Sequence, residues 1–263
     1  MPVKRIGVGD AYSGLTRAYD ELFPVHPGTV GYLLRSGLVR GGRILDVGCA
    51  AGAHPWAFAA AGLRTAGIDP SGAMIEAARA AIARGSARGG CKVGPGAPRF
   101  KTAGMLDLER LFPTATWDAV TCLGNTLPHL RDEGEVEEFL RQTRRVLAPG
   151  GFLVVQLLNY RRILAERPES LPRLETASWV FERAYLYGED SLEFLTRLSD
   201  RAGRIVSEGR ARLLPIFASV VADLAERRGF RTAALESGWD GEPFDPVSSP
   251  LALLRFVSPN PTG

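Results

Sequence analysis

The sequence predicts an α/β fold built on a parallel sheet, and three observations carry this prediction. Strand-like and helix-like segments alternate from about residue 27 to residue 158. The stretch ILDVGCAAGAHPWAFAAAG (44–62) is an apolar strand that turns through glycines into an alanine-rich helix. The strand after this helix ends in an acid, Asp69. Parallel strands need crossover connections, and the intervening helices supply them.

The elements of this alternation follow from the spacing of the apolar residues, which is helical in some segments and forms short continuous runs in others. Expected helices span 27–38, 53–61, 71–84 and 132–147, and expected strands span 43–47, 64–68, 98–102, 118–122 and 151–158. The Gly-, Pro- and Ser-rich segment 85–98 is predicted to be an exposed loop, and no function is assigned to it.

The pattern changes after Tyr160. Turn residues separate three runs with partial alternation, which predicts three antiparallel strands in a small inserted sheet. These runs are ASWVFERAYLYG, SLEFLTRLS and RIVSEGRARLLPI. A helix at 217–229 and strands at 231–237 and 251–257 then complete the large sheet. No internal repeat is found.

Composition sets the class of protein. The 263 residues are 45% hydrophobic, which suits one large domain or a domain with an inserted subdomain. The chain has no run of about 18 apolar residues, and its N-terminus has no apolar signal region, so we expect a cytoplasmic protein without a membrane span. Three widely spaced cysteines predict reduced thiols, and no His or Cys spacing fits a metal site.

Charge argues against a nucleic-acid partner. The net charge is only +3, and the basic residues are mostly arginines scattered through the chain. A bias toward GC-rich codons explains this arginine content more simply.

The loop in 44–62 indicates a nucleotide cofactor. Small residues there let the backbone approach a ligand, and the following helix offers free N–H groups at its N-terminus. Asp69 is placed to accept hydrogen bonds from two ribose hydroxyls. The spacing from Asp46 is D-x-G-x-x-x-G, whereas dinucleotide enzymes require G-x-G-x-x-G. Asp46 would interact, directly or through water, with the ammonium group of a cofactor whose tail is an amino acid. This points to S-adenosylmethionine.

Four ordered motifs resemble those of the class I S-adenosylmethionine-dependent methyltransferases: the glycine loop, GIDPSGAMIEAAR (67–79), WDAVTCLGNTLPHL (117–130) and RRVLAPGGFLVV (144–155). The resemblance implies a Rossmann-like seven-stranded sheet whose last strand is antiparallel, with an insertion after the fifth strand that covers the acceptor. It divides the chain into a lid segment (1–26), a core (27–158 and 213–263) and an inserted cover (159–212).

The resemblance also implies which residues bind the cofactor. They are Tyr12, Tyr19, Asp46, Gly48, Cys49, Gly52, Asp69, Met74, Gly104, Met105, Leu106, Leu123, Gly124 and Asn125. Two positions depart from the family: Ala50 replaces the central glycine of the loop, and Gly104 stands where many relatives have an acid for the adenine amino group. Adenine would then rely on backbone groups and apolar walls. Asp107 would either replace that acid or cap the next turn.

The residues 11–34 resemble the N-terminal lid of small-molecule methyltransferases, including relatives of glycine N-methyltransferase. Tyr12, Tyr19 and Phe23 are the lid candidates, and packing of a helix on the core is the alternative. His129 follows the fourth strand near the expected position of the methyl group. It would act there as a base or as a polar contact to cofactor or substrate, or it would only form hydrogen bonds within the loop. Structural roles are favoured for His54 and His26.

Short matches in LGNTLPHL and LLNYRRIL place Asn125, Asn159 and Tyr160 around the pocket mouth, with Tyr160 as a second catalytic candidate. The inserted strands contain several aromatic residues and Arg183, and Trp239 follows near the C-terminus. These features suit a small acceptor that is anionic or aromatic, although ordinary packing explains each aromatic equally well. The substrate candidates are Asn159, Arg183 and Trp239.

The expected function is S-adenosylmethionine-dependent methyl transfer (EC 2.1.1.-) to a small molecule, with N-methylation slightly favoured over O-methylation. One alternative is an RNA or protein methyltransferase. The sequence shows no appended RNA-binding domain, no dense basic patch and no N-P-P-Y-type motif, and this argues against that alternative. The other is a non-catalytic cofactor-binding protein, supported only by Ala50 and Gly104. A homodimer is compatible with the sequence.

Overall fold

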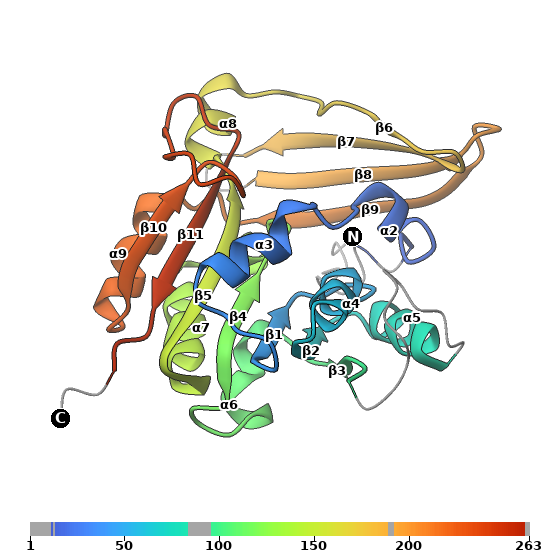
Figure 1. Cartoon of the computed structure of the whole chain (residues 1–263). Coiled ribbons are helices and arrows are strands. Elements are labelled where there is room, and N and C mark those ends of the chain that lie inside the picture. The colour runs from blue at the N-terminus through green and yellow to red at the C-terminus, as the bar shows by residue number, and fades with distance from the viewer. Residues whose placement is uncertain (1–11, 13, 84–95, 189–191, 261–263) are drawn as a thin grey trace.

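The computed structural model describes residues 12, 14–83, 96–188 and 192–260 (Figure 1). Its main sheet has seven strands in the order β10-β11-β5-β4-β1-β2-β3. The strands are β1 (Arg43–Val47), β2 (Arg64–Asp69), β3 (Arg99–Thr102), β4 (Trp117–Cys122), β5 (Leu147–Leu158), β10 (Arg231–Glu236) and β11 (Leu251–Val257). The segment 84–95, which contains most of the predicted 85–98 loop, lies outside the described residues.

The strand directions confirm the predicted sheet. β1 is parallel to β2 and β4, and the pairs β2–β3 and β4–β5 are also parallel, whereas the last strand, β11, is antiparallel to β5 and β10. The chain order reverses between β1 and β4, so the carboxyl ends of these two strands flank a topological switch point. Ligands of open α/β sheets bind at such points.

Helices cover both faces of this sheet (Figure 1). Alternate residues of a strand face opposite sides, and β1 shows the result: Ile44 packs with Leu33 and Phe58, whereas Leu45 packs with Phe139. The helices of the first face are α3 (Gly28–Arg35), α4 (Ala53–Ala60) and α5 (Gly72–Ala83), and those of the second are α6 (Leu108–Leu111), α7 (Glu133–Val146) and α9 (Ala218–Arg227). None of the described helices is both long and apolar enough to cross a membrane.

A second, antiparallel sheet lies across the carboxyl ends of the parallel strands, at the top of Figure 1. It contains β6 (Leu174–Glu175), β7 (Trp179–Tyr187), β8 (Leu192–Asp200) and β9 (Ile205–Leu213), and α8 (Tyr160–Glu166) leads into it. The sequence predicted three of these strands and neither β6 nor α8. A strand of two residues and a helix of seven are too short to show periodicity. We refer to this sheet as the roof sheet.

The roof sheet meets the N-terminal segment over the main sheet. Phe181 of β7 is fully buried against Leu15, Leu22 and the loop residue Ala50, and α2 (Tyr19–Leu22) supplies one of these contacts. The described part of the predicted lid is therefore packed between the roof sheet and the glycine loop. Residues 1–11 and 13 of that segment lie outside the described chain.

Candidate active site

The loop after β1 takes the shape that its glycines allow. Gly48 and Gly52 have φ angles of 77° and 88°, in the left-handed region that favours glycine. A Cβ atom on Gly48 would lie 2.3 Å from Thr126 Cγ2, and one on Gly52 would lie 2.7 Å from Phe100 Cζ. Ala50 is also left-handed, at φ 45°, so the small substitute keeps the backbone conformation of a glycine.

Asp69, the residue predicted to hold the ribose, is fixed by the glycine loop. Its Oδ2 accepts a hydrogen bond from Ala50 N at 3.0 Å, and its Oδ1 accepts one from Ser71 N at 2.8 Å. Burial raises the pKa of this carboxyl, and the two backbone donors oppose that rise. Each carboxylate oxygen has a second lone pair, which lets Asp69 accept hydrogen bonds from a bound ribose as well.

Asp46 lies behind the loop and is only 2% exposed. Its Oδ1 accepts a hydrogen bond from Thr121 Oγ1 at 2.7 Å, while Oδ2 finds no partner within the described part of the chain. Burial raises the pKa of Asp46 to about 7, although the Thr121 hydroxyl counteracts this shift. A buried carboxylate with a free oxygen at this position fits a cofactor whose tail bears an ammonium group.

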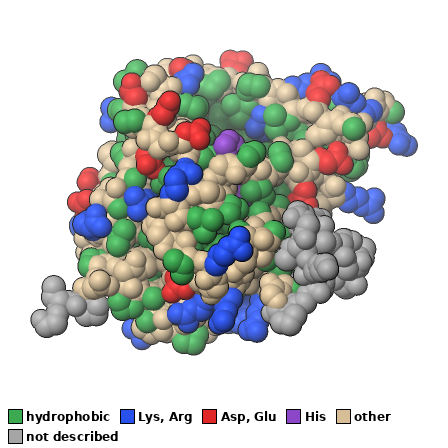
Figure 2. All heavy atoms as spheres, in the orientation of Figure 1, with side chains coloured by type: hydrophobic (Ala, Val, Ile, Leu, Met, Phe, Trp, Pro, Cys, Tyr) green, Lys and Arg blue, Asp and Glu red, His purple; other side chains and the backbone are tan. Residues whose placement is uncertain are grey.

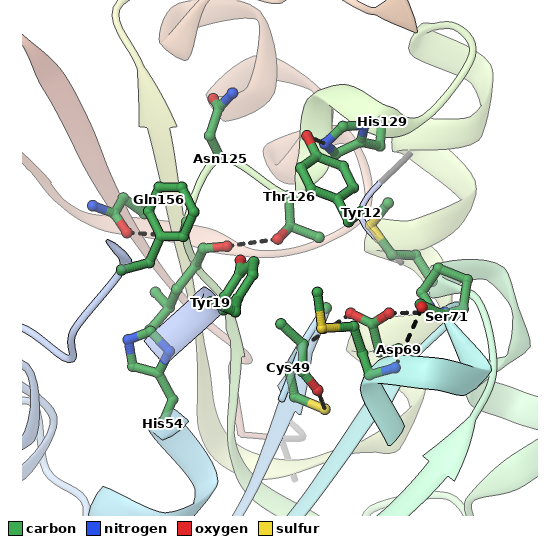
Figure 3. A pocket seen from close by; sticks show the side chains of 18 of the residues that line it. Tyr12, Tyr19, Cys49, His54, Asp69, Ser71, Asn125, Thr126, His129 and Gln156 are labelled. Carbon is green, nitrogen blue, oxygen red and sulfur yellow. Dashed lines mark hydrogen bonds between the residues drawn. The ribbon is translucent and has the colours of Figure 1, made fainter. Parts of the chain in front are cut away.

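One cavity of about 730 Å³ lies between the carboxyl ends of the parallel strands and the roof sheet. On the face in Figure 2, a histidine side chain lies in a hollow bordered by hydrophobic side chains. Figure 3 shows side chains that line the cavity, including Tyr12, His129 and Asp69. The predicted residues that line the cavity are Tyr12, Tyr19, Gly48, Cys49, Asp69, Met74, Gly104, Met105, Leu106, Leu123, Gly124, Asn125, His129, Arg183 and Trp239.

Four predicted residues are not on this wall: Asp46, Gly52, Asn159 and Tyr160. The side chain of Asn159, which was expected to contact substrate, makes its hydrogen bonds within the fold. It is 4% exposed, its Oδ1 caps α8 through Arg162 N, and its Nδ2 donates to the carbonyls of Pro246 and Ser249.

Tyr160 also lies behind the wall rather than at the pocket mouth. It is fully buried, and its hydroxyl accepts a hydrogen bond from Asn125 Nδ2 at 2.8 Å. Asn125 Oδ1 in turn accepts from Leu158 N, and the residue has a left-handed φ of 63°. Tyr160 therefore positions Asn125 and does not face the cavity itself.

The end of the cavity where the sequence predicts adenine has apolar side chains on its wall. Asp107 Oδ2 accepts from Gly104 N at 2.9 Å, and its Oδ1 accepts from the Arg110 guanidinium at 3.1 Å. Asp107 thus caps the turn at Met105–Asp107. Met105 and Leu106 supply the neighbouring apolar surface.

His129 ends the short turn Leu127–His129 that follows β4. Its Nε2 lies 3.0 Å from the Tyr12 hydroxyl, and the two rings meet edge to face (Figure 3). Burial lowers the pKa of His129 to about 4, so the ring is neutral at pH 7. Its Nδ1 is buried and has no hydrogen-bond partner among the residues that the structure describes. A neutral imidazole with a free nitrogen suits a polar ligand.

Sequence reasoning missed several wall residues. Gln156 lines the cavity and accepts a hydrogen bond from Gly124 N at 2.9 Å. Its signal was a polar residue inside the apolar run of β5. His54, given a structural role, lines the cavity as well as packing on Phe58. Tyr185 and Phe194 belong to the aromatic residues expected on the inserted sheet, and the pairing of β7 with β8 brings both to the wall.

The fold and this site define a nucleotide-binding α/β domain with an acid at the end of each of its first two strands. Residues 44–151 match the family described as methyltransferase domain. A dTDP-4-amino-2,3,4,6-tetradeoxy-D-glucose N,N-dimethyltransferase of Saccharopolyspora spinosa is 29% identical over 147 residues, 56% of this chain and 53% of that protein. Glycine N-methyltransferase of Rattus norvegicus is 30% identical over 130 residues, 47% and 42% of the two chains.

The structure of the CcbJ methyltransferase of Streptomyces caelestis shares the fold, with a TM-score of 0.75 and 21% identity over 94% of this chain and 97% of that one. The sequence matches span about half the length of the curated relatives or less. Residues 44–151 thus match a methyltransferase domain on the fold that the four sequence motifs predicted, and this match indicates S-adenosylmethionine as the cofactor.

The buried Asp46 gives the first testable prediction. The affinity for S-adenosylmethionine should rise as the pH rises through about 7, since the free protein holds a proton on Asp46 below this pKa and the cofactor's ammonium group favours the ionised form. Titration calorimetry at several pH values checks this. Asp46→Asn should keep only the pH dependence of the cofactor's own amino group. An identical pH profile in both proteins would contradict the role of Asp46.

Proposed function

We propose that the chain transfers the methyl group of S-adenosylmethionine to the nitrogen of a small-molecule acceptor. The observation that carries the proposal is the neutral, buried His129, which lies with Tyr12 on the wall of the cavity beneath the roof sheet. Two of the curated relatives have N-methyltransferase activities in their names. The roof sheet supports a small acceptor, because the acceptor must fit beneath it.

Under this proposal, this chain's own residues hold the cofactor at its two ends. Asp69 would bind the ribose, and the left-handed loop of Gly48 and Ala50 would let the backbone approach the methionine tail closely. Asp46 would balance the ammonium group. Tyr12 and Tyr19 line the cavity from the N-terminal side, where their rings would favour a sulfonium cation. When bound, the cofactor supplies an electrophilic methyl group.

His129 would orient the acceptor rather than remove its proton. Attack needs a nitrogen lone pair, and burial in the mainly apolar cavity favours the neutral form of an amine. In the tautomer whose Nε2–H donates to the Tyr12 hydroxyl, Nδ1 would accept an N–H hydrogen bond from the acceptor and so turn its lone pair toward the methyl group. With a pKa of about 4, His129 is a hydrogen-bond acceptor and only a weak base at neutral pH. The proton then leaves from the methylated nitrogen to solvent.

Methyl-labelled S-adenosylmethionine, incubated with the chain and an extract of its source organism, tests this proposal. We expect the label in a small molecule, with the mass of the acceptor raised by one methylene. Label found only in RNA or protein would contradict the small-molecule acceptor and favour the macromolecular alternative. Cofactor binding without transfer to any fraction would favour a non-catalytic binding protein.

A further inference from the structure

We propose that the acceptor carries an anionic group, a carboxylate or a phosphate, and that Arg183 and Tyr185 of the roof sheet bind this group. The proposal rests on the proposed function, since it describes the molecule that enters the same cavity. It assigns the roof sheet a part in choosing the acceptor as well as in covering it.

Arg183 and Tyr185 belong to one face of β7. Residues two apart on a strand point to the same side, and both residues line the cavity. Phe181, two positions earlier, meets the ring of Phe23 edge to face on this same side. Tyr185 pairs with Phe194 of β8, and their rings lie 5.8 Å apart. The inner face of the roof sheet is thus largely aromatic around one guanidinium group.

The guanidinium of Arg183 is poorly compensated. Its Nη2 donates a hydrogen bond to the Pro172 carbonyl at 2.6 Å, which uses one of five N–H donors. Its Nε is buried and makes no hydrogen bond to any described residue. Burial lowers the pKa of Arg183, as expected for a cation removed from water. The guanidinium carbon also lies 5.8 Å from the centre of the Phe181 ring. A carbonyl and an aromatic face are neutral partners, so no negative charge balances the cation.

Among the described residues of the cavity wall, this charge finds no counterion. Of the described residues that line the cavity, Arg183 is the only Lys or Arg, and Asp69 and Asp107 are the only acids. Both acids already accept hydrogen bonds from backbone N–H groups. A partly buried cation with only a carbonyl and an aromatic ring as partners still loses solvation free energy, and an anion on the ligand would offset that loss.

Tyr185 provides a second donor beside the guanidinium. The residue is 3% exposed, and its hydroxyl is buried with no partner in the described part of the structure. Burial raises the pKa of Tyr185 to about 12, so the hydroxyl keeps its proton at neutral pH. A guanidinium and a neutral hydroxyl on one face suit an oxyanion, because both donate and an oxyanion accepts only.

The charge of the cofactor points to the same class of acceptor. The sulfonium is positive, so an acceptor in the cavity would lie between two cations. A cationic acceptor is repelled by both, and a neutral one leaves Arg183 unpaired. An anionic acceptor is attracted by both. A phosphate and a carboxylate share this chemistry, and the mass of the methylated product distinguishes them.

Anion-exchange fractionation of the extract tests the proposal. Each fraction is incubated with the full chain and methyl-labelled S-adenosylmethionine at neutral pH. We expect the labelled product from the fraction that the column retains. A product from the unretained fraction alone would overturn the anionic acceptor and leave the methyltransferase proposal standing. Bound cofactor with no labelled product in any fraction would refute the proposed function, and the anionic acceptor with it.

Variants of the roof sheet give the second readout. With the retained fraction as acceptor, Arg183→Gln should raise the half-saturating amount at least tenfold, Arg183→Lys should raise it less, and Tyr185→Phe should raise it several-fold. Cofactor affinity should stay within twofold of wild type. The matched control is Arg197→Gln on β8, whose exposed side chain pairs with Glu208 at 2.9 Å. Arg183→Lys and Tyr185→Phe variants that behave as Arg197→Gln does would overturn the proposal.

Discussion

Replacing Asp69 with Ala is expected to weaken the binding of S-adenosylmethionine at least tenfold. The carboxylate would accept hydrogen bonds from the ribose hydroxyls, and hydrogen bonds to a charged group contribute about 1.5–3 kcal/mol each. The side chain also orients the loop through Ala50 N and Ser71 N, so the loss of Asp69 removes both the contact and its alignment. Titration calorimetry measures the change in dissociation constant.

Two further variants separate these effects. Asp69→Asn keeps one side-chain oxygen for the loop but loses the charge, and it should weaken binding less than Asp69→Ala. Asp200→Asn removes a carboxylate at the exposed end of β8, which bonds to Arg204, and it should leave the affinity unchanged. A folded Asp69→Ala protein with wild-type affinity would remove Asp69 from the cofactor site.

Replacing His129 with Ala is expected to lower kcat by about 100-fold, because a misplacement of the reacting atoms by about 1 Å costs a factor of this order. The imidazole would no longer hold the acceptor nitrogen in line with the methyl group. Tyr12→Phe removes the hydroxyl that bonds to Nε2, so it should lower kcat by a smaller factor. Single-turnover rates with labelled cofactor measure the chemical step directly.

The control for His129 is the other buried histidine of the cavity. His54 also lines the wall, and burial also lowers its pKa to about 4, but it stacks on Phe58 rather than bonding to a tyrosine. His54→Gln should keep kcat within a few-fold of wild type. Equal losses in the two variants would show that His129 acts through the packing of the cavity and not through its nitrogen.

The sequence predicted the parts of the fold and wall that depend on local chemistry. The glycines at left-handed positions and the acid at the end of β2 shape the backbone within a few residues of themselves. The sequence alone therefore predicted the loop and the place of Asp69 beside it. The parallel sheet followed from the alternation of elements, and its seven strands with an antiparallel last strand followed from the family resemblance. Both rest on short-range patterns that sequence periodicity records.

The sequence did not predict the features of the site that depend on contacts between residues far apart in the chain. Tyr12 and His129 are 117 residues apart, and their hydrogen bond depends on how the N-terminal segment crosses the carboxyl ends of the strands. Tyr185 reaches the wall through the register of β7 with β8. Asn159 shows a related limit: an asparagine after a strand suits a ligand contact and a helix cap equally well, and the sequence alone did not predict the cap that the structure shows.

Calorimetric titration of the full chain with S-adenosylmethionine, its demethylated product and NAD tests the central claim most directly. The loop has the spacing D-x-G-x-x-x-G, with a buried acid behind it, and lacks the spacing that dinucleotides require. We predict that S-adenosylmethionine and its thioether product bind and that NAD gives no heat of binding at the same concentrations. Tight binding of NAD with none of S-adenosylmethionine would contradict the account of the loop and of the cavity above it.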